Sequence, residues 1–351
     1  MYLCIRKYFL THFDFKNYQV KLYFIVFLHF ISAHQRKEKK STMSKRLKRS
    51  RLELESLPDE ILLQIFSYID FQELLQCGQV SKRIRTICSD KSFWEDIFLS
   101  RKKVKAEFIK SILDRNCDSL SIKNTVIDGC VKLNRPSKLK RLDLYCNASK
   151  DFFHEILNSC SSLEFLEISC EYSLNVVLQN LCKRNSQTLT SLSLGEYKLI
   201  SKNSIQVILK HCTQLIQIDL WDSNMSEDSM DFFVNNLSPN VKRISLSSNT
   251  ENMKDRHIET LVSRCNRITK LDLSDTKLTD TSIASVIQHL KQSLVCLQVE
   301  EATEISFEKV LELKSMPKLQ ILKYGFKSWH TMYLRGYLPH LKINEDDFGY
   351  F

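Results

Sequence analysis

One apolar spacing recurs along more than half of this chain. The spacing is LxxLxL, where L is an aliphatic side chain, and eight copies occur between residues 139 and 327. The copies begin at Leu139, Leu163, Leu189, Leu215, Val241, Ile268, Leu294 and Leu319. Successive copies start 24 to 27 residues apart, and random apolar clustering would not keep so narrow a period. A period of this length indicates one structural unit that stacks on copies of itself.

The repeat also predicts what each unit contains. A period of 20–29 residues with this spacing is typical of a leucine-rich repeat. Each copy is followed by apolar residues at helical spacing, for example Ile258, Leu261 and Val262. Strands stack about 4.8 Å apart while helices need roughly 8–10 Å, so such an array must curve with its strands inside. We therefore predict an α/β leucine-rich repeat solenoid, a horseshoe with a long solvated concave face.

Shortened repeats are expected at both ends of the array, since terminal repeats are usually atypical. The segment from Cys117 to Ile122 resembles an opening repeat, and Leu338, Leu341 and Ile343 restate the spacing near the end. This gives ten strands in a repeat domain over residues 101–351. The short C-terminal tail, residues 345–351, is acidic and then aromatic, and is expected either to cover the last strand or to remain loose.

The concave face holds the candidate ligand-binding residues. Side chains alternate along a strand, so positions 1, 4 and 6 of each copy enter the core and positions 3, 5 and 7 face the concavity. Trp221 is either a binding anchor or packs on adjacent concave side chains. Arg243 and Lys270 either clamp an acidic or phosphorylated ligand group or pair with neighbouring aspartates. The candidates are Tyr145, Phe165, Asp219, Trp221, Arg243, Lys270 and Asp272.

The twelve cysteines contain no CxxC spacing, which disfavours zinc ribbons and thioredoxin-like sites. Cys160, Cys212 and Cys265 each lie three residues before an LxxLxL copy. A recurring position implies a recurring environment, here the buried junction between helix and strand, where a thiol acts as a small hydrophobe. No metal or cofactor is expected. Many unpaired core thiols suit a reducing compartment, so we predict a location in the cytoplasm, the nucleus or both.

A short helical module precedes the repeats, at residues 53–100. Pro58 suits the first position of a helix, and two further short helices are predicted from Phe71 to Gly78 and from Ser81 to Cys88. Phe93, Trp94, Ile97 and Phe98 are expected to close the module. Fewer than 50 residues cannot enclose this much apolar surface alone. The module is therefore expected to offer an interface.

The order of motifs in this module resembles an F-box. The motifs are Leu57-Pro58-Asp59-Glu60-Ile61-Leu62, Ile65-Phe66-Ser67-Tyr68, Leu74-Leu75, Val80-Ser81-Lys82-Arg83 and Phe93-Trp94. In that family, the three-helix F-box docks on the Skp-type adaptor of a Skp–cullin–F-box ubiquitin ligase. By resemblance, the adaptor-binding residues are Leu57, Pro58, Ile61, Leu62, Leu74, Leu75, Val80 and Trp94. The chain departs from the family pattern at Gly78-Gln79 and Ser81, and its third helix lacks the tryptophan that many members have there.

The cysteine-containing repeats extend the resemblance. Together with the F-box motifs, they make residues 54–346 similar to F-box/leucine-rich-repeat proteins. The alternative is that the module is a plain helical cap on the solenoid.

The first 52 residues read as a flexible basic leader. Residues 1–51 carry a net charge of +11, whereas the rest of the chain carries −1. Because basic and acidic side chains nearly cancel after residue 51, the solenoid is not expected to bind nucleic acid. Residues 22–31 are strongly apolar, but ten helical residues cover only about 15 Å of a roughly 30 Å hydrocarbon core, so no membrane partner is expected. The basic run at residues 36–51 is either a nuclear import or anionic-surface signal or a solvated linker. Met43 has the position of an alternative translation start, so we interpret residues 1–42 as an upstream extension.

These observations predict a substrate-recognition subunit of a Skp–cullin–F-box ubiquitin ligase, without catalytic residues of its own. The module would bind the Skp-type adaptor and through it the cullin, and the concave face would bind an unknown protein substrate. A ligase-independent interaction scaffold is the alternative. A cysteine-dependent ligase is a third hypothesis, because Cys296 is a thiol at a concave position. The identity of the substrate, and whether its recognition needs phosphorylation, are not encoded in these motifs.

Overall fold

The structure of the chain is a computed structural model that describes residues 57–69, 71–197, 200–325 and 328–344. Two compact units divide between Glu95 and Asp96. The first is called the helical unit and the second the repeat unit, and each is described by itself. The predicted leader at residues 1–52 and the tail at residues 345–351 lie outside the described residues.

The helical unit contains the three short predicted helices and one further turn. These are α3 (Asp59–Phe66), α4 (Phe71–Cys77), α5 (Lys82–Cys88) and the 3-10 turn η2 (Lys91–Phe93). Pro58 is the N-cap of α3, one position before the predicted place. The Ser81 hydroxyl accepts a hydrogen bond from the Ile84 backbone N–H and so caps α5.

The core of the helical unit lies between its three helices. The buried residues are Leu57, Leu62, Ile65, Phe66, Leu74, Cys77, Ile84, Ile87 and Cys88. Trp94 packs edge-on against the Phe71 ring, with 4.8 Å between ring centroids. Its indole N–H donates to the Cys88 carbonyl at 3.0 Å. This contact joins the end of the unit to α4 and α5.

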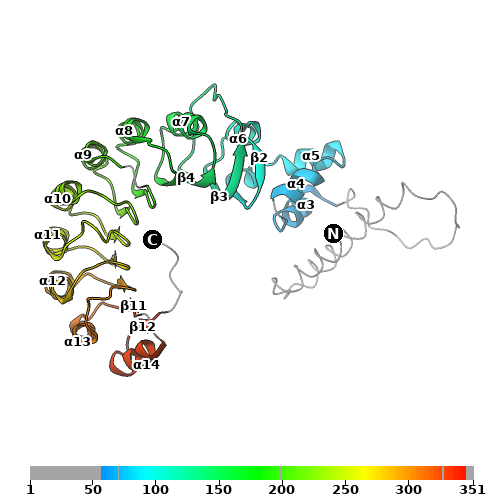
Figure 1. Ribbon diagram of the computed structural model, residues 1–351. Coiled ribbons are helices and arrows are strands. Elements are labelled where there is room, and N and C mark those ends of the chain that lie inside the picture. The colour runs from blue at the N-terminus through cyan, green and yellow to red at the C-terminus, as the bar shows by residue number, and fades with distance from the viewer. Residues whose placement is uncertain (1–56, 70, 198–199, 326–327, 345–351) are drawn as a thin grey trace, which may run out of the picture. The chain divides into compact units, whose positions relative to one another are not determined.

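The repeat unit is one parallel sheet of twelve strands that alternate with helices (Figure 1). The strands are β1 (Asp96–Ser100), β2 (Lys103–Lys105), β3 (Ser119–Asp128), β4 (Arg141–Asn147), β5 (Phe165–Ser169), β6 (Ser191–Ser193), β7 (Gln217–Asp219), β8 (Arg243–Ser245), β9 (Lys270–Asp272), β10 (Cys296–Val299), β11 (Ile321–Tyr324) and β12 (Lys342–Ile343). The order is β1-β3-β4 and onward to β12, with β2 paired to β3. Strands line the inner side of this unit's arc and helices the outer side, which confirms the predicted fold class.

The helices of the repeat unit follow the strands in chain order. They are α6 (Ala106–Leu113), α7 (Lys150–Ser159), α8 (Asn175–Arg184), α9 (Lys202–His211), α10 (Glu227–Asn236), α11 (Asp255–Arg264), α12 (Asp280–Leu290), α13 (Phe307–Leu311), the 3-10 turn η3 (Glu312–Ser315) and α14 (Ser328–Tyr337). None of the described helices combines the length and apolarity needed to cross a membrane.

The apolar spacing places its side chains in register across the sheet. Leu192, Ile218, Ile244 and Leu271 occupy the same position on four adjacent strands. Positions 1, 4 and 6 of all eight copies are at most 6% exposed. The recurring cysteines 160, 212 and 265 are buried in the same core. These observations confirm the predicted core face, and such stacking requires each repeat to cover its neighbour.

The sheet begins earlier than the sequence analysis expected, because β1 and β2 precede the ten predicted strands. Ile97 and Phe98 lie in β1, whose residues pair in parallel with β3, and not in the helical unit. The signal was present, since Trp94, Ile97 and Leu99 have the LxxLxL spacing with a tryptophan in first place. Strand β1 buries Ile97 and Leu99, while the Phe98 side chain between them is 62% exposed. The alternation of a half-buried strand therefore applies here too.

Polar side chains at the helix starts tie successive repeats together. Asp255, the first residue of α11, accepts hydrogen bonds from the Thr279 N–H at 3.0 Å and its hydroxyl at 2.8 Å. It also accepts one from the Ser282 hydroxyl. Asp280, the first residue of α12, binds the N–H and hydroxyl of Ser306 in the same way, both at 2.7 Å. Each carboxylate thus helps to cap the helix of the following repeat.

Candidate functional site

The eight predicted adaptor-binding residues divide between the surface and the core of the helical unit. Pro58 and Val80 are exposed, and Ile61 and Leu75 are half-buried. The other four, Leu57, Leu62, Leu74 and Trp94, are buried. In this arrangement, the four exposed or half-buried side chains can touch a partner directly. The four buried side chains hold that surface in place.

Two arginines of α5 connect the three helices. Arg83 of α5 donates to the Leu57 carbonyl at 2.7 Å and from Nε to Asp59 Oδ1 at 3.1 Å. Arg85 donates from Nε to the Gly78 carbonyl at 3.0 Å. The first arginine fixes the start of α3, where Pro58 lies, and the second fixes the end of α4. Pro58 and Val80 are therefore held on a positioned surface.

The concave face of the repeat unit carries three rows of side chains that run across the strands. Their register follows from the strand pairing of β4 to β9. The first row contains Arg141, Phe165, Ser191, Gln217, Arg243 and Lys270. The second row, called the acidic row, contains Asp143, Glu167, Ser193, Asp219, Ser245 and Asp272. The third row contains Tyr145, Ser169, Gly195, Trp221, Ser247 and Ser274.

Most carboxylates of the acidic row form no ion pair with a described lysine or arginine. Asp143 is the exception, because its Oδ2 lies 3.0 Å from Lys123 Nζ. Among the described residues, no lysine or arginine forms an ion pair with Glu167, Asp219 or Asp272. Asp219 is only 8% exposed. A buried carboxylate without a counter-ion is costly, because burial removes its hydration.

Neutral donors hold Asp219, which is buried, and Asp272, which is half-buried, in place. Asp219 accepts from the Trp221 N–H and from the Ser193 hydroxyl, both at 3.1 Å. Asp272 accepts from the Ser274 N–H at 3.0 Å and the Ser245 hydroxyl at 3.4 Å. The serines of the acidic row are therefore hydrogen-bond donors to the next strand.

These surroundings raise the pKa values of three carboxyl groups in the acidic row. Burial raises the pKa of Asp219 to about 6, against the opposing effect of its hydrogen bonds from Trp221, Ser245 and Ser193, and the charge of Asp272 adds to the rise. Burial also raises the pKa of Asp272. The pKa of Glu167 is raised by burial and then by the charge of Asp143, while the charge of Lys123 opposes the rise. The acidic row thus holds negative charge in a place that penalises it.

Trp221 lies over the neighbouring strand. A Cβ atom at Gly195 would be 1.7 Å from Trp221 Nε1, so only glycine lets the indole occupy this place. The tryptophan is half-buried, and within the described part of the chain its indole N–H has no hydrogen-bond partner. The structure thus shows the predicted packing on a concave neighbour. Its backbone N–H is bonded to Asp219, two residues earlier on the same strand end.

The basic concave residues lie in the first row. Arg243 Nη1 donates to Gln217 Oε1 at 3.4 Å, and among the described ion pairs none joins Arg243 to a neighbouring aspartate, which was one of the two predicted alternatives. Burial lowers the pKa of Lys270, and the charge of Arg243 lowers it further. Arg141 stacks over the Phe165 ring at 4.3 Å from its centroid. The anion clamp of Arg243 and Lys270 stays a prediction. Tyr145 is 40% exposed on the same face.

Cys296 does not have the surroundings of an activated nucleophile. The residue is 3% exposed, and burial raises the pKa of its thiol. A reactive thiol needs a lowered pKa and access to its substrate.

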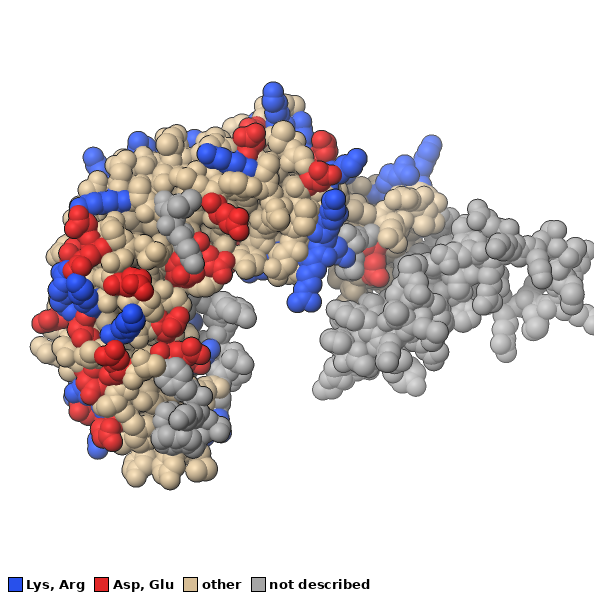
Figure 2. All heavy atoms as spheres, viewed as in Figure 1, with Lys and Arg blue, Asp and Glu red and all other residues tan. Residues whose placement is uncertain are grey.

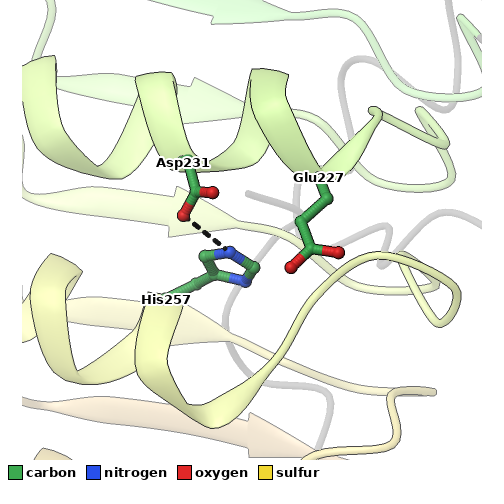
Figure 3. Close-up of side chains that lie close together, drawn as sticks. All are labelled: Glu227, Asp231 and His257. Atoms are coloured by element: carbon green, nitrogen blue, oxygen red, sulfur yellow. Dashed lines mark hydrogen bonds and ion pairs between the residues drawn. The ribbon is translucent and has the colours of Figure 1, made fainter.

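On the helix side, three potential metal ligands come together (Figure 3). Glu227 and Asp231 lie on α10 and His257 on α11, with one ligand atom of each within 4.8 Å of the others. His257 Nδ1 accepts from the Lys254 backbone N–H at 2.9 Å, so the neutral ring carries its proton on Nε2. That nitrogen lies 3.1 Å from Asp231 Oδ1.

Protein partners already use the ligand atoms of this cluster. Lys254 Nζ lies 2.7 Å and Arg256 Nη2 2.6 Å from Glu227 Oε1. Arg256 also binds Asp231 through Nη1 at 2.5 Å. Burial lowers the pKa of His257, with Arg256 adding to the effect. A metal ion would have to displace two cations and the Lys254 hydrogen bond. The arrangement is explained by repeat-to-repeat packing.

Charge is also sorted between the two edges of the repeat unit. Acidic residues occupy the first turns of most helices of this unit, though not, for example, of α8 or α9, and Figure 2 shows acidic side chains gathered on the viewed face of this unit. They include Asp151, Glu227, Asp228, Asp255, Asp280 and Glu308. Basic residues occupy the last turns, for example Lys183, Arg184, Lys210 and Arg264. This sorting complements the helix dipoles and makes the edge where the strands end acidic.

Two family models match the chain. The model described as F-box-like matches residues 54–100, and the model described as SKP2 LRR domain matches residues 107–350. One similar curated protein is the F-box/LRR-repeat protein 5 of Danio rerio, 26% identical over 184 residues. That stretch covers 52% of this chain and 26% of the relative, so the match spans about a quarter of the relative's length.

Solved structures with similar chains were also found. A chain in the crystal structure of the Rad7 and Elc1 complex in yeast has 14% identity and a TM-score of 0.49, covering 94% of this chain and 98% of that chain. The leucine-rich repeat-containing protein LegL7 from Legionella pneumophila has 16% identity and a TM-score of 0.42, covering 63% and 82%.

Proposed function

Because the chain belongs to the F-box/leucine-rich-repeat family, we propose that it is the substrate-recognition subunit of a Skp–cullin–F-box ubiquitin ligase. Members of this family are in general non-catalytic substrate adaptors, and an F-box in general binds a Skp-type adaptor. The observation that carries the proposal is the union in one chain of an F-box with a repeat sheet whose inner face is lined by polar and aromatic side chains.

Each unit would perform one step. Pro58 and Val80, with the half-buried Ile61 and Leu75, would contact the adaptor, and the adaptor would connect the chain to the cullin. The concave face would hold a protein target near the ubiquitin-charged enzyme. Its contribution is positioning, because holding two reactants together raises the effective concentration of target lysines.

Adaptor capture by the full chain tests the proposal. We expect Val80→Asp to abolish co-purification with a Skp-type adaptor, since a carboxylate would be buried in an apolar interface. Val176 on α8 is 69% exposed, so Val176→Asp is a matched control that should bind normally. Thermal unfolding of both variants checks that they fold.

The same experiment separates the alternatives. Equal adaptor binding by the Val80→Asp variant and the wild-type chain would refute the proposed surface. A wild-type chain that binds target proteins but never captures the adaptor would instead be a ligase-independent scaffold. A location in the cytoplasm or nucleus is part of the proposal, supported by the free thiols of the described cysteines, and is tested by microscopy of a tagged chain.

A further inference from the structure

We propose that the acidic row and Trp221 form a binding site for an extended segment of the target that carries lysine or arginine side chains. The inference rests on the proposed function, because it names the class of protein that the concave face would receive. It depends on three observations: uncompensated carboxylates, an aromatic ring beside them, and a buried acceptor atom without a partner.

The uncompensated carboxylates come first. Glu167, Asp219 and Asp272 have no ion-pair partner among the described residues. Elsewhere in the repeat unit carboxylates do have cations, as Glu227 and Asp231 have Arg256. The difference is one of position, since the helix-side pairs stabilise the array while the concave carboxylates face the open side of the sheet. A cation supplied by a ligand would compensate them.

Trp221 supplies the second element. Its indole lies over Gly195, just after β6, and its backbone N–H donates at 3.1 Å to Oδ1 of Asp219, which is two residues earlier on the same concave face. A cation over an indole face is attracted by the ring's quadrupole. A guanidinium or ammonium group could therefore contact the ring and the Asp219 carboxylate together. An anionic group would be repelled by the Asp219 carboxylate at this place.

Asp143 supplies the third element. The residue is 9% exposed, and its Oδ1 atom is buried without a hydrogen-bond partner. Its other oxygen is used by the Ser121 hydroxyl at 2.8 Å and by Lys123. Buried acceptors are normally satisfied, and a donor at the end of a long side chain would satisfy this one.

The spacing of the row indicates the form of the ligand. Glu167, Asp219 and Asp272 lie on every second strand, so their backbones are about 10 Å apart. An extended polyproline-type segment advances about 3.1 Å per residue with three residues per turn. Basic side chains at every third residue are then about 9 Å apart on one face. Such a segment, crossing the strands, presents one cation to each carboxylate.

The test uses the full chain and a fluorescein-labelled twelve-residue peptide with arginine at every third position and alanine and serine between. Fluorescence anisotropy at low salt should show binding to the wild-type chain. Asp219→Asn should weaken it on the order of tenfold, and Trp221→Leu should also weaken it. Asp275→Asn is the matched control, because Asp275 is exposed at the acidic edge with a φ of 49° that asparagine also adopts. It should change binding by less than about twofold.

Three outcomes would overturn the inference. One is the absence of binding to the wild-type chain, and another is an equal loss in the Asp219→Asn and Asp275→Asn variants, which would show general attraction to the acidic edge. The third is equal binding of a peptide with glutamate in place of arginine. Asp219→Asn should unfold at the same or a higher temperature than wild type, so lost binding would not reflect lost folding. Adaptor capture by the same samples is measured separately, so failure of this site and failure of the ligase proposal are distinguishable.

Discussion

Asp255 and Asp219 lie on opposite sides of the repeat unit, and their surroundings shift the pKa of the same kind of side chain in opposite directions. Both accept hydrogen bonds from a backbone N–H and from hydroxyl groups of an adjacent repeat. For Asp255, on the helix side, burial raises the pKa but the bonds from Ser282 and Thr279 outweigh it, so the pKa is lowered. For Asp219, on the concave face, burial dominates and the pKa rises to about 6.

The difference shows where charge supports the fold and where it opposes it. Asp255 is half-buried at a helix start and receives donors from the start of the next helix, where negative charge is favourable. Asp219 is more deeply buried and lies on the same row as Asp272. The helix side therefore uses its carboxylates to join repeats, whereas the concave face keeps carboxylates that folding alone would not favour.

Removing the helix-side carboxylate should have the largest effect. We expect Asp255→Ala to lower the free energy of unfolding by about 3 kcal/mol, because hydrogen bonds from Thr279 and Ser282 to a charged group are lost. Urea unfolding measures it. Asp255→Asn keeps part of the cap and should lose less, and an unchanged stability of Asp255→Ala would contradict the assigned role.

Neutralising Asp219 on the concave face should instead raise the free energy of unfolding. Its pKa is about 6 when folded and about 3.9 when unfolded. Between these values the folded chain holds the extra proton, so the contribution of Asp219 to stability falls as pH rises. We expect Asp219→Asn to raise the free energy of unfolding by up to roughly 3 kcal/mol at alkaline pH.

That gain should shrink as the pH falls from about 6 to about 4, where Asp219 is protonated in both the folded and the unfolded states. Unfolding of both proteins across this range measures it. A gain that is constant with pH, or a loss, would show that the carboxylate is not destabilised by its surroundings.

The smallest effect is expected along the acidic row itself. The charge of Asp272 contributes to the raised pKa of Asp219, but less than burial does. In Asp272→Asn the pKa of Asp219 should therefore fall below about 6 while staying above its ordinary value. Carboxyl-carbon NMR titration of both proteins measures the shift. Asp275→Asn, which changes the same charge on an exposed residue, should leave the Asp219 titration unchanged.

Several parts of the fold could be predicted because they repeat. The apolar copies placed β4 to β11 and their core positions correctly, and Pro58 and Ser81 marked the starts of α3 and α5. Strand β1 was missed because a tryptophan stands where the other copies have an aliphatic residue, although Ile97 and Leu99 kept the spacing.

The candidate site was predicted only in outline. The spacing placed Asp219 and Trp221 on the concave face, but the contact of Trp221 with Gly195 joins residues 26 positions apart and depends on the strand register. The roles of Arg83 and Arg85, which join three helices, have no counterpart in a local pattern. Nor does the sequence distinguish buried members of the F-box motifs, such as Leu62, from exposed members, such as Val80.

By itself, the sequence determined the period, the strand and helix alternation, and which face of each strand is apolar, because these depend on neighbours a few residues apart. Only the tertiary structure decided which charges are compensated. The acid strength of Asp219 or Asp255 depends on burial and on donors from repeats some 24 to 27 residues away. Such distances along the chain become contacts only when repeats stack in a defined register.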